Sequence, residues 1–171
     1  MMRVVSISTE AGEFVAHFSE HGLAEIDFPG RRKVEDPSRS QLPTQTSLNS
    51  STDFGQWERL TANALRATLA GKPAGTLPPF DWRGATEFQQ CIWRALLRIP
   101  PGRTSSYAEV AAAAGRPRAV RAAGSACGAN PIPVLVPCHR VVATGGGLGG
   151  FSGGLDWKRR LLAREGVQLS I

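Results

Sequence analysis

Alternating apolar and polar positions characterise the first thirty residues of the chain. In FVAHF (residues 14–18) and LAEIDF (residues 23–28) every second side chain is apolar, and Gly22 marks a turn between the two stretches. A period of two is typical of a strand that buries one face. With the short segment of residues 3–8 before the TEAGE turn, the pattern predicts three half-buried antiparallel strands.

A polar run without a period follows these strands. It is rich in turn-forming residues and predicts a long surface loop over about residues 30–56. Apolar residues from Trp57 to Leu69 then recur at helical spacing, which predicts a helix that ends near Gly71. The Pro-rich stretch of residues 71–82 that comes next has the composition of a linker between two units.

The residues beyond this linker predict mainly helices. Two Ser/Thr-x-x-Glu/Gln spacings, which start at Thr86 and at Ser106, are those of capping boxes at helix N-termini. The fold class that results is α/β. An N-terminal domain over residues 1–80, with a small antiparallel sheet and a helix, precedes a mainly helical C-terminal domain over residues 81–171.

Two short helices of this second domain form a helix-turn-helix candidate. The first, YAEVAAAA, stops at Gly115. Residues 118–128 form the second, with Pro117 at a position where the start of a helix accepts proline. An abrupt turn that contains glycine between two short helices is typical of the motif.

The last predicted helix, WKRRLLARE, places one acidic residue on its apolar side. Leu161 and Leu162 precede Glu165 by four and three residues, and side chains at these spacings share a helix face. We therefore expect the carboxylate of Glu165 to face the interior or to lie close to it.

The net charge of +6 is concentrated in the second half of the 171-residue chain. Residues 1–80 carry 8 Lys or Arg against 9 Asp or Glu, whereas residues 81–171 carry 12 against 5. Seventeen of the 20 basic residues are Arg, whose planar guanidinium suits multidentate contacts with phosphates and bases. The charge favours a nucleic-acid partner, although a basic surface that binds nothing is also compatible with it.

The cysteines and the apolar runs exclude several classes of protein. Three cysteines without a CxxC pair suggest neither a disulfide framework nor a zinc cluster. No apolar run reaches the roughly 20 residues that span a bilayer, and the start MMRVVSISTEAGEF has no secretory signal. We therefore expect a cytoplasmic protein with free thiols and no membrane partner, associated with the nucleoid if its source is bacterial.

The stretch PIPVLVPCHR ends an apolar run with a thiol, an imidazole and a guanidinium. A cysteine beside a histidine is weak evidence by itself, because a buried cysteine is more often a small apolar residue than a nucleophile. Here the glycine-rich stretch ATGGGLGGFSGG follows at once, and reactive groups that face such a loop are typical of a binding site. Cys138 is then a candidate nucleophile, with His139 as its base.

Several motifs in this half of the chain resemble one family. NPIPVLVPCHRVV, SYAEVA before it, the Arg of AVRAAG between them, and GFSGG and the Glu of LLAREG after it resemble the O6-alkylguanine-DNA alkyltransferases, the methylated-DNA protein-cysteine methyltransferases. The resemblance covers about residues 86–166, whereas residues 1–80 match only in pattern.

The resemblance implies DNA repair by direct reversal of damage. The alkyl group of O6-alkylguanine, and of O4-alkylthymine, in double-stranded DNA would pass irreversibly to the protein itself after the damaged nucleotide is flipped out. An RNase H-like N-terminal domain, a monomer in solution and the absence of a cofactor are also implied, while cooperative binding along DNA stays open.

The resemblance assigns the chemistry to four residues. Cys138 is implied to take the alkyl group, while His139, linked through a water to Glu165, accepts the thiol proton. Asn130 resembles the family's hinge asparagine, which ties the helix-turn-helix to the active-site segment. The alternatives are a surface arginine as the partner of Glu165, and an ordinary place at a helix C-terminus for Asn130.

The resemblance assigns recognition to a second set of residues. Tyr107 is implied to donate to the guanine and to help rotate the phosphate, and Arg121 to fill the gap that the flipped nucleotide leaves in the stack. The alternatives are an aromatic ring packed on Leu96 for Tyr107, a solvated charge for Arg121 and a plain turn residue for Ser152. The substrate-binding set is Tyr107, Ser152, Val141 and Pro133, and the DNA-binding set is Arg121, Tyr107, Arg118 and Ala122.

Other reactive side chains have no assigned role in the chemistry. Cys127 falls in the predicted recognition helix and is interpreted as structural, with a contact to DNA as the alternative. Arg140 and Arg118 either bind a DNA phosphate or stabilise the fold. Some members of the family hold a zinc ion in the N-terminal region, but only His17 and His21 are available there, so we expect no metal.

Three other functions compete with repair. A binding protein similar to the alkyltransferase-like proteins would lack the cysteine, and Cys138 argues against it. A DNA-binding regulator with a helix-turn-helix needs no thiol beside its reading helix. A cysteine hydrolase or redox enzyme requires a resolving cysteine or an Asn or Asp partner for His139, and neither is evident.

Overall fold

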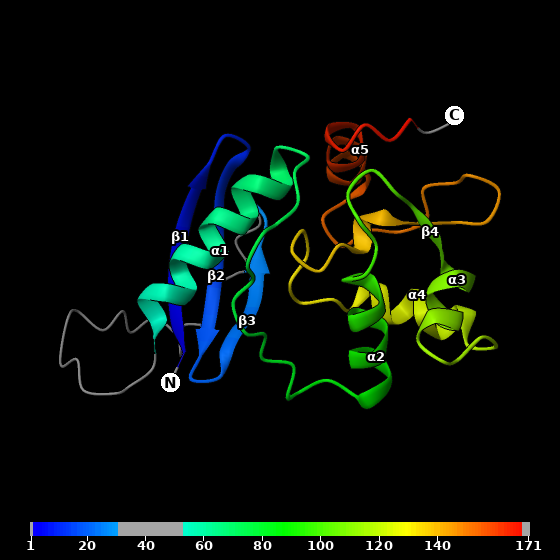
Figure 1. Ribbon diagram of the computed structural model, residues 1–171, viewed down its shortest axis with the longest axis horizontal. Helices are drawn as coiled ribbons and strands as arrows, with labels where there is room; N and C mark the ends of the chain where they lie inside the picture. Colours follow the sequence, from blue (N-terminus) through cyan, green and yellow to red (C-terminus); the bar gives the residue numbers. More distant parts are fainter. Residues whose placement is uncertain (1, 31–52, 169–171) are drawn as a thin grey trace.

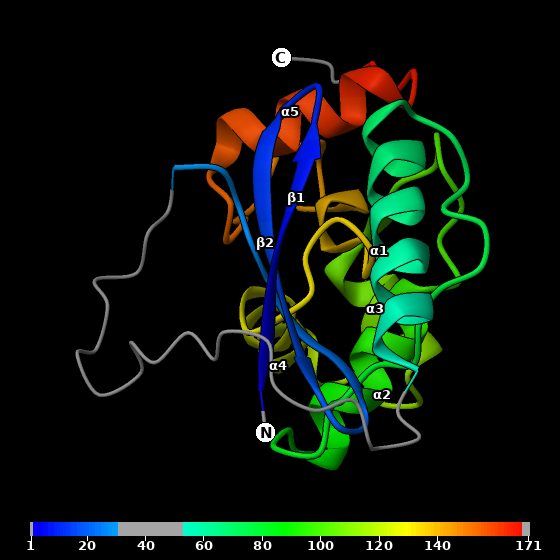
Figure 2. The same cartoon turned by 90° about the vertical axis from the view of Figure 1, so that its left-hand side faces the viewer.

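The computed structural model describes residues 2–30 and 53–168, and its N-terminal half is a three-stranded sheet with one long helix against it (Figures 1 and 2). The strands are antiparallel and adjacent in chain order: β1 (Arg3–Thr9), β2 (Gly12–Ser19) and β3 (Gly22–Asp27). On β2 the side chains of Phe14, Ala16 and Phe18 are fully buried, as alternation onto one face requires. The three predicted strands are confirmed to within two residues at each end.

The helix α1 (Phe54–Leu69) lies against this sheet, as Figure 2 shows. Its N-terminus is capped by Asp53, whose side chain accepts a hydrogen bond from the backbone N–H of Gln56 at 3.3 Å. Because of this cap the helix begins earlier than the sequence analysis expected, and the predicted loop end near residue 56 is wrong. Residues 31–52 of the predicted loop lie outside the described residues.

Capping boxes start two helices in the C-terminal half, as predicted. At the start of α2 (Glu87–Leu96), the hydroxyl of Thr86 accepts from the backbone N–H of Gln89 at 3.2 Å, and Oε1 of Gln89 accepts from the backbone N–H of Thr86 at 2.9 Å. The helix α3 (Tyr107–Ala113) begins with the same reciprocal pair after Ser106.

The helix α4 (Val120–Gly128) completes the helix-turn-helix but starts later than predicted. Pro117 lies in a turn, where the backbone N–H of Ala119 donates to the C=O of Arg116 at 2.9 Å. Ala119 has φ −94° and ψ 37°, so helical geometry begins only at the next residue. The prediction of a helix over residues 118–128 with Pro117 at its start is therefore wrong at its N-terminal end.

The edge strand β3 joins the two halves of the molecule. The backbone N–H of Ile26 donates to the C=O of Pro131 at 2.9 Å, and Leu23 forms backbone hydrogen bonds with both Pro79 and Asp81. The predicted linker is thus paired with the sheet, and the division of the chain at residue 80 stays a prediction. The remaining elements are β4 (Ser105–Ser106), the 3-10 helix η2 (Cys138–Arg140), β5 (Val141–Val142), which pairs in parallel with β4, and α5 (Leu155–Arg164).

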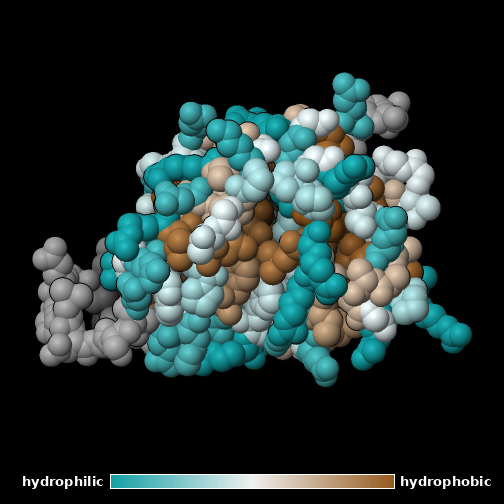
Figure 3. Space-filling model, viewed as in Figure 1, coloured by the Kyte–Doolittle hydropathy of each residue, from teal (hydrophilic) through white to brown (hydrophobic). Residues whose placement is uncertain are grey.

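Buried apolar residues form one cluster that runs from the sheet to α4 and α5. In the space-filling view, apolar residues gather in the middle of the face shown, inside a rim of hydrophilic residues (Figure 3). The segment that carries the candidate chemistry lies within this shared core, because it packs against β3 on one side and follows α4 on the other.

Candidate active site

Cys138 is the first residue of η2, at the end of the apolar segment that follows α4. Only 4% of the residue is exposed, and its Sγ accepts a hydrogen bond from Nδ2 of Asn130 at 3.2 Å. Earlier in the same segment Val134 has a φ of +74°, a costly conformation for a β-branched residue that persists only where surrounding contacts enforce it. The backbone before the thiol is therefore fixed by its neighbours.

Asn130 restrains this segment with both ends of its amide. In addition to its bond to the sulfur, Nδ2 donates to the C=O of Val136 at 2.8 Å, and Oδ1 accepts from the backbone N–H of Ile132 at 3.0 Å. Asn130 is buried and lies just beyond the end of α4. The amide therefore connects the helix-turn-helix directly to the segment that carries Cys138.

His139, Arg140 and Glu165 form a buried cluster of charged and polar groups next to the thiol. Nε2 of His139 lies 2.9 Å from Oε1 of Glu165, and Arg140 donates to both oxygens of the same carboxylate at 2.8 to 3.2 Å. The side chain of Glu165 is 1% exposed. The expected water between His139 and Glu165 is wrong, because α5 brings the two side chains into direct contact.

Arg140 has the structural role that the sequence analysis left open. It is 6% exposed, and its Nη1 donates to the C=O of Ile99 at 2.6 Å while its other nitrogens bind Glu165. A guanidinium with these partners does not reach a phosphate on the surface. It neutralises a carboxylate that would otherwise be buried and unpaired.

The charges of this cluster determine where the protons lie. Although burial by itself raises the pKa of Glu165, hydrogen bonds from His139 and Arg140 lower that pKa to about 2. Burial lowers the pKa of His139. An ionised carboxylate only accepts, so the neutral imidazole donates its Nε2–H and keeps a lone pair on Nδ1. Among the described residues Nδ1 is buried without a hydrogen-bond partner, which leaves it able to accept a proton.

The sulfur is not a nucleophile in the resting protein. Burial raises the pKa of Cys138 to about 11, and the hydrogen bond from Asn130 and the positive charge of Lys158 offset this only in part. At pH 7 the group is therefore a thiol. Chemistry at this sulfur needs a base, and the adjacent His139 carries the unprotonated nitrogen.

A cavity of about 560 Å³ has Cys138 in its wall and joins residues of α3, α4 and the glycine-rich loop. The hydroxyl of Tyr107, in the first turn of α3, accepts a hydrogen bond from the backbone N–H of Gly150 at 3.2 Å. Gly149 has φ +67°, and a Cβ there would lie 2.5 Å from that hydroxyl oxygen, so the close approach of the loop requires glycine. The lining consists of Tyr107, Arg121, Gly124, Ser125, Cys127, Gly128, Cys138, Gly150, Phe151 and Ser152.

The predicted substrate-binding residues divide into two groups. Tyr107 and Ser152 line the cavity, whereas Val141 and Pro133 are buried and do not belong to its lining among the residues described. The backbone C=O of Val141 is occupied by Nζ of Lys158 at 2.5 Å. The structure therefore brings Tyr107 and Ser152 to the wall of the sulfur's cavity and leaves Val141 and Pro133 in the supporting layer.

The predicted DNA-binding residues other than Tyr107 lie on the surface around the start of α4. Arg121 and Ala122 are in its first turn and Arg118 is in the turn that precedes it, and all three are exposed. Arg121 also lines the cavity. Cys127, later in α4, also lines the cavity but is buried, and burial raises its pKa to about 12. The cavity that contains Cys138 is thus bordered by an exposed, positively charged helix start.

The sequence analysis missed Lys158, a fully buried lysine on α5. Its Nζ donates to three backbone carbonyls, those of Val141, Leu148 and Gly150. Burial lowers the pKa of Lys158 to about 8. The residue ties the glycine-rich loop to β5. A signal was present in the sequence, because Lys158 precedes the Leu-Leu pair of its helix by three and four residues and so shares their buried face.

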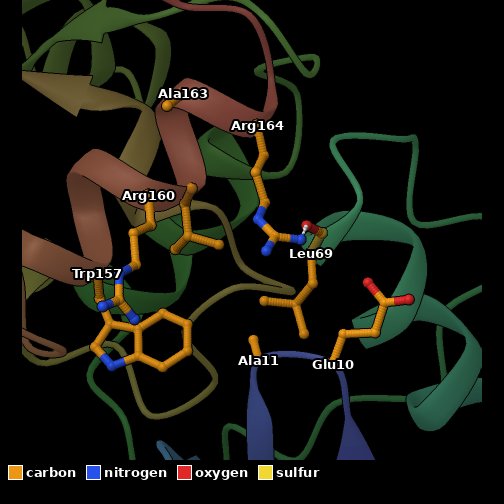
Figure 4. Close-up of a pocket in the computed structure, with 8 residues that line it drawn as sticks. Glu10, Ala11, Leu69, Trp157, Arg160, Ala163 and Arg164 are labelled. Atoms are coloured by element: carbon orange, nitrogen blue, oxygen red, sulfur yellow. Dashed lines mark hydrogen bonds between the residues drawn. The ribbon is translucent and has the colours of Figure 1, made fainter.

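A second hollow, of about 440 Å³, lies between the β1–β2 turn, the end of α1 and α5 (Figure 4). Arg164 donates to the C=O of Leu69 at 2.9 Å, and the guanidinium of Arg160 lies 5.7 Å from the ring centre of Trp157. Both arginines therefore already have partners. The predicted site residues do not line this hollow.

The described residues contain neither a cluster that could hold a metal ion nor a helix that could span a membrane. Within residues 2–30 and 53–168, no three His, Cys, Asp or Glu side chains are placed to hold a metal ion. His17 contacts Asp27 at 2.8 Å, and His21 contacts Glu20 at 3.2 Å. None of the helices described is long and apolar enough to cross a membrane. The expectation of no metal stays a prediction.

The chain is similar to proteins named methylated-DNA--protein-cysteine methyltransferase. Residues 87–167 match the family described as 6-O-methylguanine DNA methyltransferase, DNA binding domain. The methylated-DNA--protein-cysteine methyltransferase of Methanosarcina barkeri is 37% identical over 163 residues, which cover 93% of this chain and 94% of that relative. The protein of the same name from Mycolicibacterium paratuberculosis is 47% identical over 129 residues, covering 73% and 77%. The crystal structure of Mycobacterium tuberculosis OGT in complex with DNA is 35% identical, with a TM-score of 0.71 over 96% of this chain and 91% of that chain.

Proposed function

Because the chain belongs to the methylated-DNA--protein-cysteine methyltransferase family, which repairs DNA by alkyl transfer, we propose that Cys138 takes the alkyl group from O6 of guanine in duplex DNA. In the same proposal, Cys138 also takes the alkyl group from O4-alkylthymine. The observation that supports it most is a buried thiol in a cavity wall, followed in the chain by an imidazole whose Nδ1 has no partner among the described residues. These are the parts that a transfer to sulfur requires.

The reaction proceeds as an in-line displacement at the alkyl carbon. His139 takes the thiol proton on Nδ1, and its imidazolium is stabilised by the ionised Glu165 at 2.9 Å. The sulfur forms a bond to the alkyl carbon while the bond from that carbon to O6 breaks, and the electron pair stays with the guanine. The guanine takes up one proton and the imidazolium gives up the proton that it took from the thiol, so the protons balance. The product is a thioether, which offers water no acyl carbon to attack, so each chain reacts once.

The substrate reaches the sulfur only outside the base stack. O6 of a paired guanine lies on the major-groove edge of a stacked base pair, and the Cys138 sulfur is buried in a cavity wall, so the nucleotide has to be extruded into the cavity to reach it. Arg121 borders both the cavity and the exposed start of α4, a place from which it fills the vacated position in the stack. Tyr107 and Ser152 then face the extruded base.

Contacts to the DNA backbone complete the proposal. The exposed Arg118 and the backbone of the α4 N-terminal turn face phosphates, and Ala122 packs against the groove without a charge. These contacts carry affinity and no sequence information, as a repair protein that accepts any context requires. Two domains divided near residue 80 and a monomer in solution remain part of the proposal.

Cys138→Ser separates the chemistry from binding. The variant should transfer nothing, because a serine hydroxyl is far less acidic and less nucleophilic than a thiol, and it should bind alkylated duplex within a few fold of the wild type. Binding is measured by gel shift, and transfer by loss of the label from an oligonucleotide that carries a labelled O6-methyl group. Residual transfer by the variant would contradict the role of Cys138, and parallel loss of binding would contradict the separation.

A further inference from the structure

Four aromatic rings form a contact chain from the N-terminal sheet to the cavity of Cys138. Phe14 of β2 and Phe28, one residue beyond β3, have ring centres 5.6 Å apart. Phe28 lies 5.0 Å from Trp157 of α5 and 5.7 Å from Phe151 of the glycine-rich loop. The last of these pairs is edge to face, with an interplanar angle of 76°.

Phe151 is the member of this chain that reaches the candidate active site. It lines the cavity that contains Cys138, and its ring lies 6.4 Å from the imidazole of His139, again edge to face. One ring therefore borders both the space for an alkyl group and the proposed base. Its position depends on what packs behind it, and the ring behind it is that of Phe28, the residue that follows β3.

The loop is shaped so that Phe28 and Phe151 can meet. A Cβ at Gly153 would lie 2.6 Å from Cε1 of Phe151 and 2.7 Å from Cε2 and Cζ of Phe28. Any side chain at Gly153 would force the two rings apart. Phe28 is 5% exposed, so its ring fills a closed space that a smaller side chain would leave partly empty.

We propose that Phe28 is a positioning residue for alkyl transfer, which holds the ring of Phe151 as a fixed wall of the Cys138 cavity and thereby limits the size of the alkyl group. This rests on the proposed function of that cavity. The proposal gives the N-terminal half of the molecule a part in the reaction, although none of residues 2–30 lines the cavity. With Phe28 shortened, Phe151 gains room to turn away from the sulfur.

The test compares transfer of a small and a large group. Single-turnover rates at saturating duplex are measured for O6-methylguanine and O6-benzylguanine, in wild type, Phe28→Leu and Phe28→Met. The second variant fills most of the volume without a ring. Methyl transfer should slow about tenfold through looser positioning, and the ratio of benzyl to methyl rates should rise about fivefold.

Phe18→Leu is the matched control. Phe18 is fully buried on β2, in the sheet that precedes Phe28, and forms no ring pair with Phe151 among the residues described. This variant should lower Tm as Phe28→Leu does, and leave the ratio of benzyl to methyl rates at the wild-type value. An unchanged ratio in both Phe28 variants, or an equal change in Phe18→Leu, would overturn the proposal.

A double variant tests whether Phe28 acts through Phe151. If it does, adding Phe28→Leu to Phe151→Leu should leave the rate ratio where Phe151→Leu alone puts it. Multiplicative effects of the two changes would overturn the coupling. Failure of the wild type to transfer any methyl group would instead contradict the proposed function, so the two failures are distinguishable.

Discussion

On one side of the cavity Cys138 is held by polar side chains, whereas on the other side the glycine-rich loop is held by backbone contacts and aromatic rings. Asn130 fixes the first side, beside the cluster of His139, Arg140 and Glu165. The second side has no comparable network of charged side chains among the described residues; Lys158 binds its carbonyls, and Phe28 packs behind Phe151.

Because the two sides are held differently, we expect the polar side to determine the reaction rate and the loop side to determine the shape of the cavity. A buried ion cluster loses much of its stability when one member is removed, because an unpaired charge remains. When a side chain in a packed wall is shortened, the loss of stability is smaller, because neighbouring side chains move part of the way into the space. Changes on the polar side should therefore affect every substrate alike, and changes in the wall should depend on the substrate.

The largest effect is expected for Glu165→Gln, on the polar side. Without the carboxylate, Arg140 is buried without its ion partner and His139 loses the group that stabilises its protonated form. Unfolding free energy should fall by about 3–5 kcal/mol, and transfer of methyl and of benzyl groups should slow together by about a hundredfold or more. Urea unfolding and single-turnover kinetics measure the two effects.

Arg159→Gln is the control for that substitution, since Arg159 is exposed on the same helix and, among the residues described, its ion partner is Asp156 at 3.3 Å. It should change stability by less than about 0.5 kcal/mol and leave the rates unchanged. An effect of Glu165→Gln no larger than that of Arg159→Gln would contradict the importance of the polar cluster.

Arg121→Ala tests a residue that belongs to neither side. If Arg121 supports the flipped nucleotide, the rate at saturating duplex should fall about a hundredfold, while the reaction with free O6-benzylguanine, which needs no flipping, stays near the wild-type rate. The control is Arg118→Ala, which should weaken binding and leave the rate at saturation alone. Equal losses on both substrates would point to a damaged fold, and no loss at saturation would make Arg121 a surface charge.

Lys158→Met weakens the loop side and should have a smaller effect. Three carbonyls lose a donor, so unfolding free energy should fall by about 1–3 kcal/mol and methyl transfer should slow about tenfold. Lys72→Met, at an exposed lysine, is the comparison. If a Lys158→Met variant that is folded by circular dichroism transfers no alkyl group, the loop side takes part in the reaction itself. That result would contradict the distinction between the polar side and the loop side.

The smallest expected effect is the acid dependence of stability. The pKa of Glu165 in the folded protein is about 2, below its usual 4.5, so the stabilisation is complete above about pH 4.5 and is lost as pH falls toward 2. The difference in unfolding free energy between wild type and Glu165→Gln should shrink by about 2 kcal/mol between pH 6 and pH 3. A constant difference over this range would contradict the ionised, hydrogen-bonded state of Glu165.

Local signals explain what the sequence predicted well. The capping boxes at Thr86 and Ser106 are formed by residues three positions apart, so their spacing alone predicts both helix starts. The inward position of Glu165 follows from its spacing to two leucines in the same way. The start of α4 was predicted too early because Pro117 suits a turn as well as a helix start, and the backbone of Ala119 decides between them.

Contacts between distant segments explain what the sequence could not show. The hydrogen bond that His139 donates to Glu165 joins residues 26 positions apart and depends on how α5 packs on η2. Lys158 looked like one charge among several on a basic helix, although its spacing to the leucines placed it inside. The pair of Phe28 and Phe151 joins residues from opposite ends of the chain, and no local pattern connects them.

The central claim is that Cys138 alone accepts the alkyl group, once per chain. The direct measurement is the mass of the intact protein, and of its peptides, after incubation with excess duplex that carries O6-methylguanine. We predict a gain of one methyl in place of the thiol hydrogen, on the peptide that contains Cys138, with Cys91 and Cys127 unchanged. An unchanged mass, or a methyl group on either of the other cysteines, would contradict the account.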